Sequence, residues 1–155
     1  MLSNKVMVFV FVTFIGGVIL SACAVAPTSR GPSQSNLSLT APQTSKPLSK
    51  EIESFMVTLT NDGSADAEVD VSLDTVRGAT WRAALCYEEF CFFHNGKDAL
   101  HHTLPLAGGE VREFEIKLFL PKTVQPGEGK TLKVEAASVD NLAASASVEF
   151  EGFVP

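Results

Sequence analysis

The stretch Phe114–Leu120, FEIKLFL, decides the fold expected for this chain. Its even-numbered positions are all apolar, and two of the three positions between them are charged. Successive side chains of a β-strand point to opposite faces, so a period of two predicts a strand with one buried face. An amphipathic helix would need a period near 3.6 residues, which this stretch lacks.

The same alternation recurs along the last two thirds of the chain. Further half-buried strands are expected at Phe55–Leu59, Val69–Leu73, Trp81–Leu85, Leu132–Ala136 and Ala146–Phe150, with shorter ones near Phe90–Phe93 and Leu100–Leu104. Turn-forming clusters separate them at Asn61–Ser64, Arg77–Gly78, Asn95–Gly96, Ala107–Gly109 and Pro126–Gly129. About seven short strands in about 100 residues are typical of an immunoglobulin-like β-sandwich. We therefore predict an all-β sandwich over residues 51–155.

A family resemblance supports this prediction. The segments TLTNDGSADAEVDVSL, TWRAALC and LPLAGGEVREFEIKLFLPKTVQPGEGKTLKVEAAS follow one another in the order seen in bacterial immunoglobulin-like domains. The chain resembles those domains as they occur in surface lipoproteins and secreted glycosidases. The resemblance implies a non-catalytic scaffold or adhesion module. In such a sandwich Trp81 is expected in the core rather than at a carbohydrate site.

The N-terminus has the features of an export signal. Lys5 precedes an apolar run, Val6–Leu20, which is shorter than the roughly 20 residues of a membrane-spanning helix and suits a secretory signal. The tetrapeptide Leu20–Cys23, LSAC, resembles the lipobox of bacterial lipoproteins. The resemblance implies that residues 1–22 are a signal peptide and that Cys23 becomes the lipidated, palmitate-bearing N-terminus. An ordinary secretory signal, cleaved after Ala22 or Ala24, is the alternative.

The same resemblance predicts an address. In enteric bacteria the family's signal for retention in the inner membrane is Asp directly after the lipidated Cys, and here Ala24 occupies that position. A diderm host would send the protein to the outer membrane, and a monoderm host would keep it on the outer face of its cytoplasmic membrane. Residues 23–50 are rich in Ser, Thr, Pro and Ala, so we expect a disordered tether before the folded domain.

The three cysteines of the chain are expected to have two different roles. If Cys23 carries lipid, Cys86 and Cys91 remain, and an extracytoplasmic location permits a disulfide between them. They bracket Tyr87, Glu88, Glu89 and Phe90, which we expect to form a four-residue hairpin loop. The bond is interpreted first as a structural staple. The alternative is that it pins these four residues as a recognition loop.

A small copper or redox carrier is the alternative function. Blue-copper sites need one Cys, two His and a weak axial Met, and Cys91 and His94 have a plausible local spacing. The second His would have to be His101 or His102, no Met follows Cys91, and using Cys91 would leave Cys86 alone. Neighbouring residues of a strand face opposite sides, so His101 and His102 cannot readily share one ion. We therefore expect no metal site and no cofactor.

Charge and motifs narrow the remaining function classes. The chain has 12 basic and 18 acidic residues, a net charge of −6, which becomes −7 once Lys5 is removed with the signal. An acidic protein without a basic block is unsuited to nucleic acid. No Gly-x-Ser-x-Gly, His-Glu-x-x-His or phosphate-loop motif is present, so we expect no enzyme. The expected partners are the membrane, through the lipid, and an envelope protein or glycan.

Overall fold

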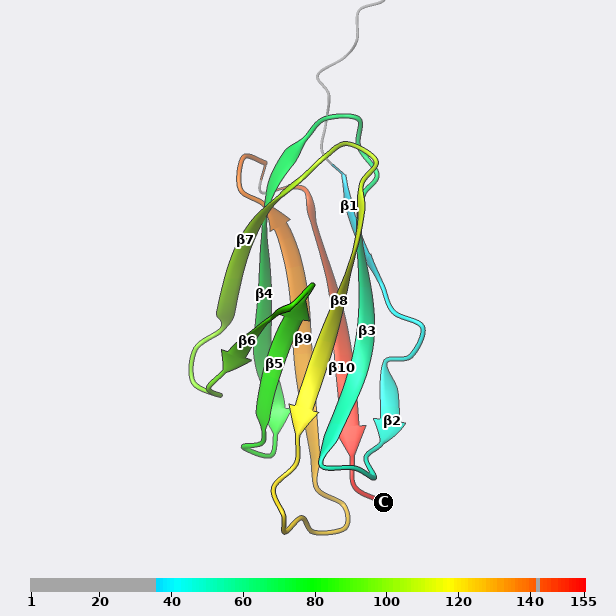
Figure 1. Cartoon of the computed structure of the whole chain (residues 1–155), viewed down its shortest axis with the longest axis vertical. Helices are drawn as coiled ribbons and strands as arrows, with labels where there is room; N and C mark the ends of the chain where they lie inside the picture. The colour runs from blue at the N-terminus through cyan, green and yellow to red at the C-terminus, as the bar shows by residue number, and fades with distance from the viewer. Residues whose placement is uncertain (1–35, 142) are drawn as a thin grey trace, which may run out of the picture. The chain divides into compact units, whose positions relative to one another are not determined.

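In the computed structural model, which describes residues 36–141 and 143–155, two five-stranded β-sheets pack face to face (Figure 1). All strand pairs are antiparallel except β2 with β10, which is parallel. Among the described residues, no helix is long and apolar enough to cross a membrane. The expected all-β sandwich is confirmed.

The strand order distributes the chain evenly between the sheets. Sheet A has the order β1 (Leu37–Thr40), β3 (Ile52–Asn61), β8 (Val111–Phe119), β5 (Arg82–Tyr87) and β6 (Phe90–His94). Sheet B has the order β2 (Ser45–Pro47), β10 (Ser145–Phe153), β9 (Gly129–Ser138), β4 (Ala67–Gly78) and β7 (Leu100–Leu106). In Figure 1 sheet A lies in front of sheet B.

This topology is immunoglobulin-like. A constant-type domain has one sheet in the order A-B-E-D and the other in the order C-F-G. Strands β1-β3-β8-β5 reproduce the first order when lettered along the chain, and β4-β9-β10 reproduce the second. The segment containing β6 and β7 is inserted between the fourth and fifth of these lettered strands, and it extends one edge of each sheet.

The domain starts earlier than predicted and has more strands. A disordered tether over residues 23–50 is wrong for residues 37–48, which contain β1 and β2 and bring the described strands to ten instead of about seven. Leu37 and Leu48 are both buried, and β1 pairs with β3 while β2 pairs with β10. Two leucines and the backbone bonds of two sheet edges therefore order a segment whose composition suggests disorder. The predicted signal peptide and Cys23 lie outside the described residues.

The core consists of the alternating residues that the sequence pattern identified. Phe114, Ile116 and Leu118 of β8 are at most 1% exposed, and Trp81 is buried as expected. They meet the inward-facing residues of sheet B, which are Val69, Val71, Leu73, Leu132, Val134, Ala136 and Phe150. Burial of these side chains supplies the main driving force for folding.

Candidate functional site

The β5–β6 hairpin carries the predicted disulfide. Cys86 and Cys91 are bonded, with Cα atoms 4.0 Å apart and directly opposite in the strand register. The predicted four-residue loop is wrong, because Tyr87 and Phe90 pair with each other as strand residues and leave a two-residue turn, Glu88–Glu89. Asn-Gly and similar pairs announce such turns in a sequence, whereas Glu-Glu does not.

The four residues proposed for recognition divide into two kinds. Tyr87 packs inward, with its ring 5.2 Å from Phe114 and the Arg112 guanidinium 5.3 Å above its face. Glu88, Glu89 and Phe90 are exposed, and Phe90 retains 65% of its accessible surface. The hairpin therefore exposes two carboxylates and one phenyl ring. Tyr87 lies on the inner side of the hairpin and packs against Phe114 and Arg112.

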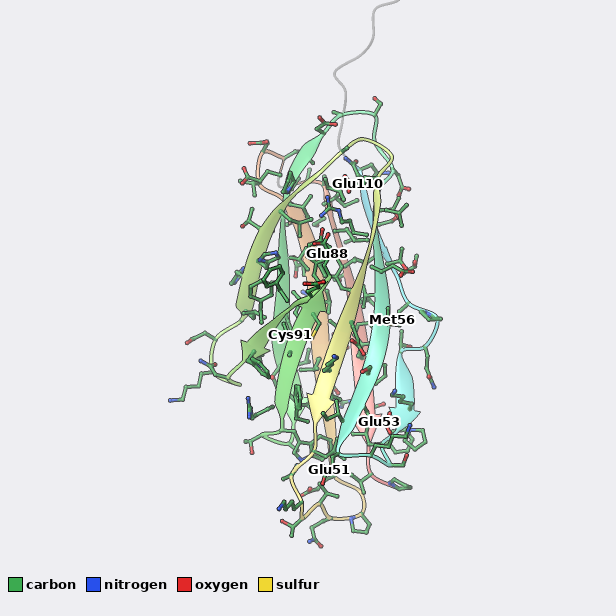
Figure 2. The ribbon with its side chains drawn as sticks, in the orientation of Figure 1. Glu51, Glu53, Met56, Glu88, Cys91 and Glu110 are labelled. Carbon is green, nitrogen blue, oxygen red and sulfur yellow. A yellow bond between two sulfur atoms is a disulfide. The ribbon has the colours of Figure 1, made fainter. Side chains whose placement is uncertain are left out.

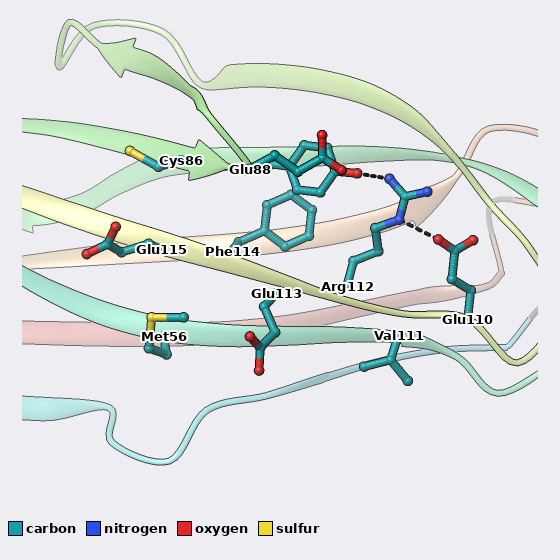
Figure 3. A pocket seen from close by; sticks show the side chains of 10 residues that line it. Met56, Cys86, Glu88, Glu110, Val111, Arg112, Glu113, Phe114 and Glu115 are labelled. Carbon is teal, nitrogen blue, oxygen red and sulfur yellow. Dashed lines mark hydrogen bonds and ion pairs between the residues drawn. The ribbon is translucent and has the colours of Figure 1, made fainter.

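A depression of about 790 Å³ lies beside the hairpin, between β3, β8 and the end of β5 (Figure 3). It exists because β5 stops following β8 after the pair Cys86–Glu115, so the first residues of β8 have no strand on that side. Figure 2 marks Met56 on β3, Glu88 at the turn and Glu110 before β8 around it. Its lining residues are Met56, Cys86, Tyr87, Glu88, Glu110, Val111, Arg112, Glu113, Phe114 and Glu115.

The charge of this depression is predominantly negative. Its single cation, Arg112, has Nε 2.5 Å from Glu110 Oε1 and donates a second hydrogen bond to the Tyr87 hydroxyl. A hydrogen bond from Ser54, followed by Lys117 3.1 Å away, holds the pKa of Glu115 below its ordinary value although partial burial acts in the opposite direction. Glu88 and Glu113 are exposed at the rim. The site presents fixed carboxylates next to the apolar Met56 and Val111.

The outer face of sheet A exposes large hydrophobic side chains both in the depression and outside it. Ile52, Met56, Phe93 and Val111 are all large hydrophobic side chains exposed by about half. Near the other end of the sheet, the Arg82 guanidinium lies 5.0 Å from the Phe93 ring and 5.8 Å from the Phe119 ring. Ile52 pairs with Phe119 at one end of β3 and Val111 pairs with Thr60 at the other, so these residues do not form one continuous patch. Met56 and Val111 are the two that line the depression.

The outer face of sheet B is charged instead. Asp70 Oδ2 lies 2.7 Å from His101 Nδ1, Lys133 Nζ lies 2.5 Å from Glu135, and Arg77 reaches Glu151. The hydrogen bond to Glu135 raises the pKa of Lys133 above its ordinary value. The large hydrophobic residues exposed on this sheet, Val76 and Phe153, lie near the ends of β4 and β10, so the centre of the face is polar and charged.

Among the residues that the structure describes, two ionisable groups are buried between the sheets. Lys130 is 1% exposed, and its ammonium donates to the carbonyl of Trp81 at 2.7 Å and to that of Ala79 at 3.3 Å. Burial lowers the pKa of Lys130. His94 is 2% exposed, and burial and then the charge of Lys130 lower the pKa of His94, while Asp74 and the backbone of Asp98 act to raise it.

The residues of the hypothetical copper site do not come together. The Cys91 sulfur is bonded to Cys86, and Cys91 faces outward while His94 faces the core. His101 lies on the outer face of sheet B with Asp70, and the His102 ring stacks on Phe92 at 4.3 Å. Within residues 36–141 and 143–155, no three His, Cys, Asp or Glu side chains are grouped to hold a metal ion.

Several residues of the site were missed by sequence reasoning. Met56, Glu113 and Glu115 occupy the outward positions of strands that alternation had identified, but alternation does not tell which outward face is solvated. Arg112 was missed because its role depends on the end of β5, a feature of topology. Buried Lys130 precedes Leu132 by two residues, so it lies on the same face of the strand as the buried residues of Leu132–Ala136. This spacing was the available signal for its burial.

No family model matches this chain, and no curated protein matches it. Among solved structures, a PapD-like domain of human CEP192 is 16% identical with a TM-score of 0.44, over 84% of this chain and 92% of that one. The secreted serine protease VesC from Vibrio cholerae is 15% identical with a TM-score of 0.49, over 78% of this chain and 23% of that one. The N-terminal domain of PorA is 12% identical with a TM-score of 0.44, over 77% and 88%.

Proposed function

We propose that this chain is a lipid-anchored, non-catalytic immunoglobulin-like module of the cell envelope that binds another envelope protein. The observation that carries the proposal is the composition of the depression beside the β5–β6 hairpin. There Met56 and Val111, which are 43% and 57% exposed, lie among Glu88, Glu113 and Glu115. Exposed apolar side chains next to carboxylates offer a partner both apolar area and charge complementarity.

The charges around Met56 define the chemistry of the partner. Glu88, Glu113 and Glu115 surround the depression, and its cation, Arg112, already pairs with Glu110. A partner surface that places Lys or Arg side chains beside an apolar group would complement this arrangement. The partner is therefore an envelope protein with a basic and apolar patch.

The lipid anchor follows from the lipobox and places the domain on a membrane surface. Two or more acyl chains on Cys23 would anchor the chain stably. The location is the outer membrane of a diderm host or the outer face of the cytoplasmic membrane of a monoderm host.

Anchoring is tested by labelling cells with a clickable palmitate analogue. The wild-type chain should take up label and sediment with membranes, and Cys23→Ala should do neither. Label retained in Cys23→Ala would refute lipidation at this residue.

Binding is tested by in-cell photo-crosslinking from Met56, with Ser147 on the outer face of sheet B as the matched position. Met56 should capture a defined protein, and Glu113→Lys should abolish the capture, whereas Glu149→Lys on sheet B should not. Equal capture from both positions would contradict the proposal. If the adduct captured at Met56 resisted protease, the partner would be a glycan and not a protein.

A further inference from the structure

The four sheet edges of the described domain are protected to different degrees. Edge strands offer unpaired backbone groups, and proteins protect them with short length, Pro, Lys or bulges. Strand β1 has four residues, β2 has three including Pro47, and β7 contains Pro105. Strand β6, Phe90–His94, has the sequence FCFFH with neither Pro nor Lys, and no register shift occurs in its pairing with β5.

The register of the hairpin determines which groups of β6 are free. In a two-residue hairpin the closing pair, here Tyr87 and Phe90, exchanges backbone hydrogen bonds, and bonded pairs then alternate with non-bonded pairs. Phe90, Phe92 and His94 therefore bond to β5. The N–H and C=O groups of Cys91 and Phe93 point away from β5, toward the open edge.

We propose that β6 pairs antiparallel with β6 of a second copy of this chain. Cys91 of one copy would exchange two hydrogen bonds with Phe93 of the other, and Phe92 would lie opposite its own equivalent on the two-fold axis. The two copies of sheet A would join into one ten-stranded sheet. The proposal goes beyond the proposed function, because it uses the edge of sheet A and needs no other envelope protein.

Charge favours a second copy in this register. The acidic residues Glu88 and Glu89 lie at one end of β6. Arg82 and Lys97 lie near the other end together with Asp98 and Asp74, so the charges there balance while the turn is acidic. Antiparallel pairing centred on Phe92 places Glu89 of each copy opposite Asn95 of the other, between Arg82 and Lys97. A parallel arrangement would instead place the two acidic turns together.

Exposure favours the same occupant. Phe90 and Phe93 retain 65% and 53% of their accessible surface, although they lie on a strand in the middle of the molecule's sequence and not at a frayed end. Pairing across the edge would cover both rings, since Phe90 would face His94 and Phe93 would face Cys91 of the second copy.

The experiment measures the mass of the full chain, purified in detergent, by light scattering over a concentration series. The wild-type chain should be a dimer, and Phe93→Lys and Phe90→Lys should each be monomers with an unchanged far-ultraviolet spectrum. The matched control is Thr103→Lys, an exposed outward position on the β7 edge, which should remain a dimer. A monomeric wild type, or a dimer that survives Phe93→Lys, overturns the proposal.

A charge exchange tests the register. Glu89→Lys should lower the dimer fraction, and adding Lys97→Glu to it should restore the dimer. Carbodiimide crosslinking of a mixture of unlabelled and ¹⁵N-labelled chains should join Glu89 of one isotope to Lys97 of the other. Crosslinks within one isotope alone, or the absence of restoration, would overturn the register. Photo-capture from Met56 is independent of these outcomes, so failure of the dimer and failure of the proposed function are distinguishable.

Discussion

The two flanks of the sandwich are closed in opposite ways. On one flank a single segment, carrying β1 and β2, extends an edge of each sheet and inserts Leu37 and Leu48 into the core. Lys46 of β2 binds Glu53 of β3 at 3.0 Å and so links the two sheets. On the other flank β7 also inserts Leu104 and Leu106 into the core, whereas β6 is held by the disulfide and by ring contacts such as that of Phe92 with His102.

The difference shows which flank is closed by packing within the domain and which flank leaves side chains exposed for contact with another molecule. The β1–β2 flank is filled by close packing, since a Cβ added at Gly152 would lie 2.9 Å from side-chain atoms of Leu48 and Leu118. The β6–β7 flank holds the exposed Phe90 and Phe93, the buried His94 and the strained turn at Glu88. On β6 the disulfide adds to the burial that His94, Leu104 and Leu106 provide on this flank.

The largest effect is expected from Leu48→Ala, which opens the packed flank. Leu48 is 3% exposed, and truncating a buried leucine costs about 2–5 kcal/mol of unfolding free energy. Urea unfolding should show this loss. The control is Ile52→Ala, on an exposed side chain close in sequence, which should cost less than about 1 kcal/mol. Equal losses in the two variants would mean that the flank is not closed by packing.

Removing the disulfide should cost the other flank about 2 kcal/mol, the loop-closure entropy of so small a ring. The change is the double variant Cys86→Ala and Cys91→Ala. Its urea midpoint should fall to that of the reduced wild-type chain, and reductant should have no further effect on it. A double variant as stable as the oxidised wild type would show that the bond does not staple this flank.

Acid should weaken the β6–β7 flank through His94. The pKa of His94 is lowered in the folded chain below the ordinary value of 6.5, so the unfolded chain binds more protons as the pH falls below 6.5. Stability is therefore complete above this value and declines below it, with a slope of at most about 1.4 kcal/mol per pH unit.

Thermal unfolding between pH 5 and 8 measures this slope. His94→Gln should reduce it, and Lys130→Met should also reduce it, because the Lys130 charge contributes to the lowered pKa of His94. An unchanged slope in His94→Gln would assign the acid sensitivity to other groups.

The smallest effect is a gain at the hairpin turn. Glu88 has φ of 53°, and among the described residues it is the one non-glycine residue with positive φ. A side chain in this conformation costs about 1–2 kcal/mol. Glycine avoids this cost because it has no Cβ, but its greater freedom in the unfolded chain offsets part of the gain. Glu88→Gly should raise the stability by about 0.5–1 kcal/mol, whereas Glu89→Gly should lower it. A loss in Glu88→Gly would mean that the carboxylate itself supports the turn.

Much of the fold was predictable because it depends on local alternation. Val69–Leu73, Phe114–Leu118 and Leu132–Ala136 each place their apolar residues on one face, and each belongs to an interior strand of a sheet. The disulfide was predictable from the count of cysteines. These features require no knowledge of which strands are neighbours.

The remainder depends on partners distant in sequence. The β1 and β2 segment, read alone, is Ser-, Thr- and Pro-rich, and it becomes strand only because the edges of β3 and β10 are available. The depression depends on where β5 stops following β8, and the burial of Lys130 depends on carbonyls of Ala79 and Trp81, about 50 residues earlier. No local pattern encodes such geometry.

The parallel pairing of β2 with β10 has a consequence for the order of folding. Ser45 pairs with Glu151, so one of the first strands of the domain waits for the last. As the chain emerges from the N-terminus, in synthesis or in export, β2 has no partner until β10 has emerged. Closing so long a loop is slow, and it predicts that the β2–β10 pair forms after the centres of both sheets. A truncation within β10 would therefore release the beginning of the domain as well as its end.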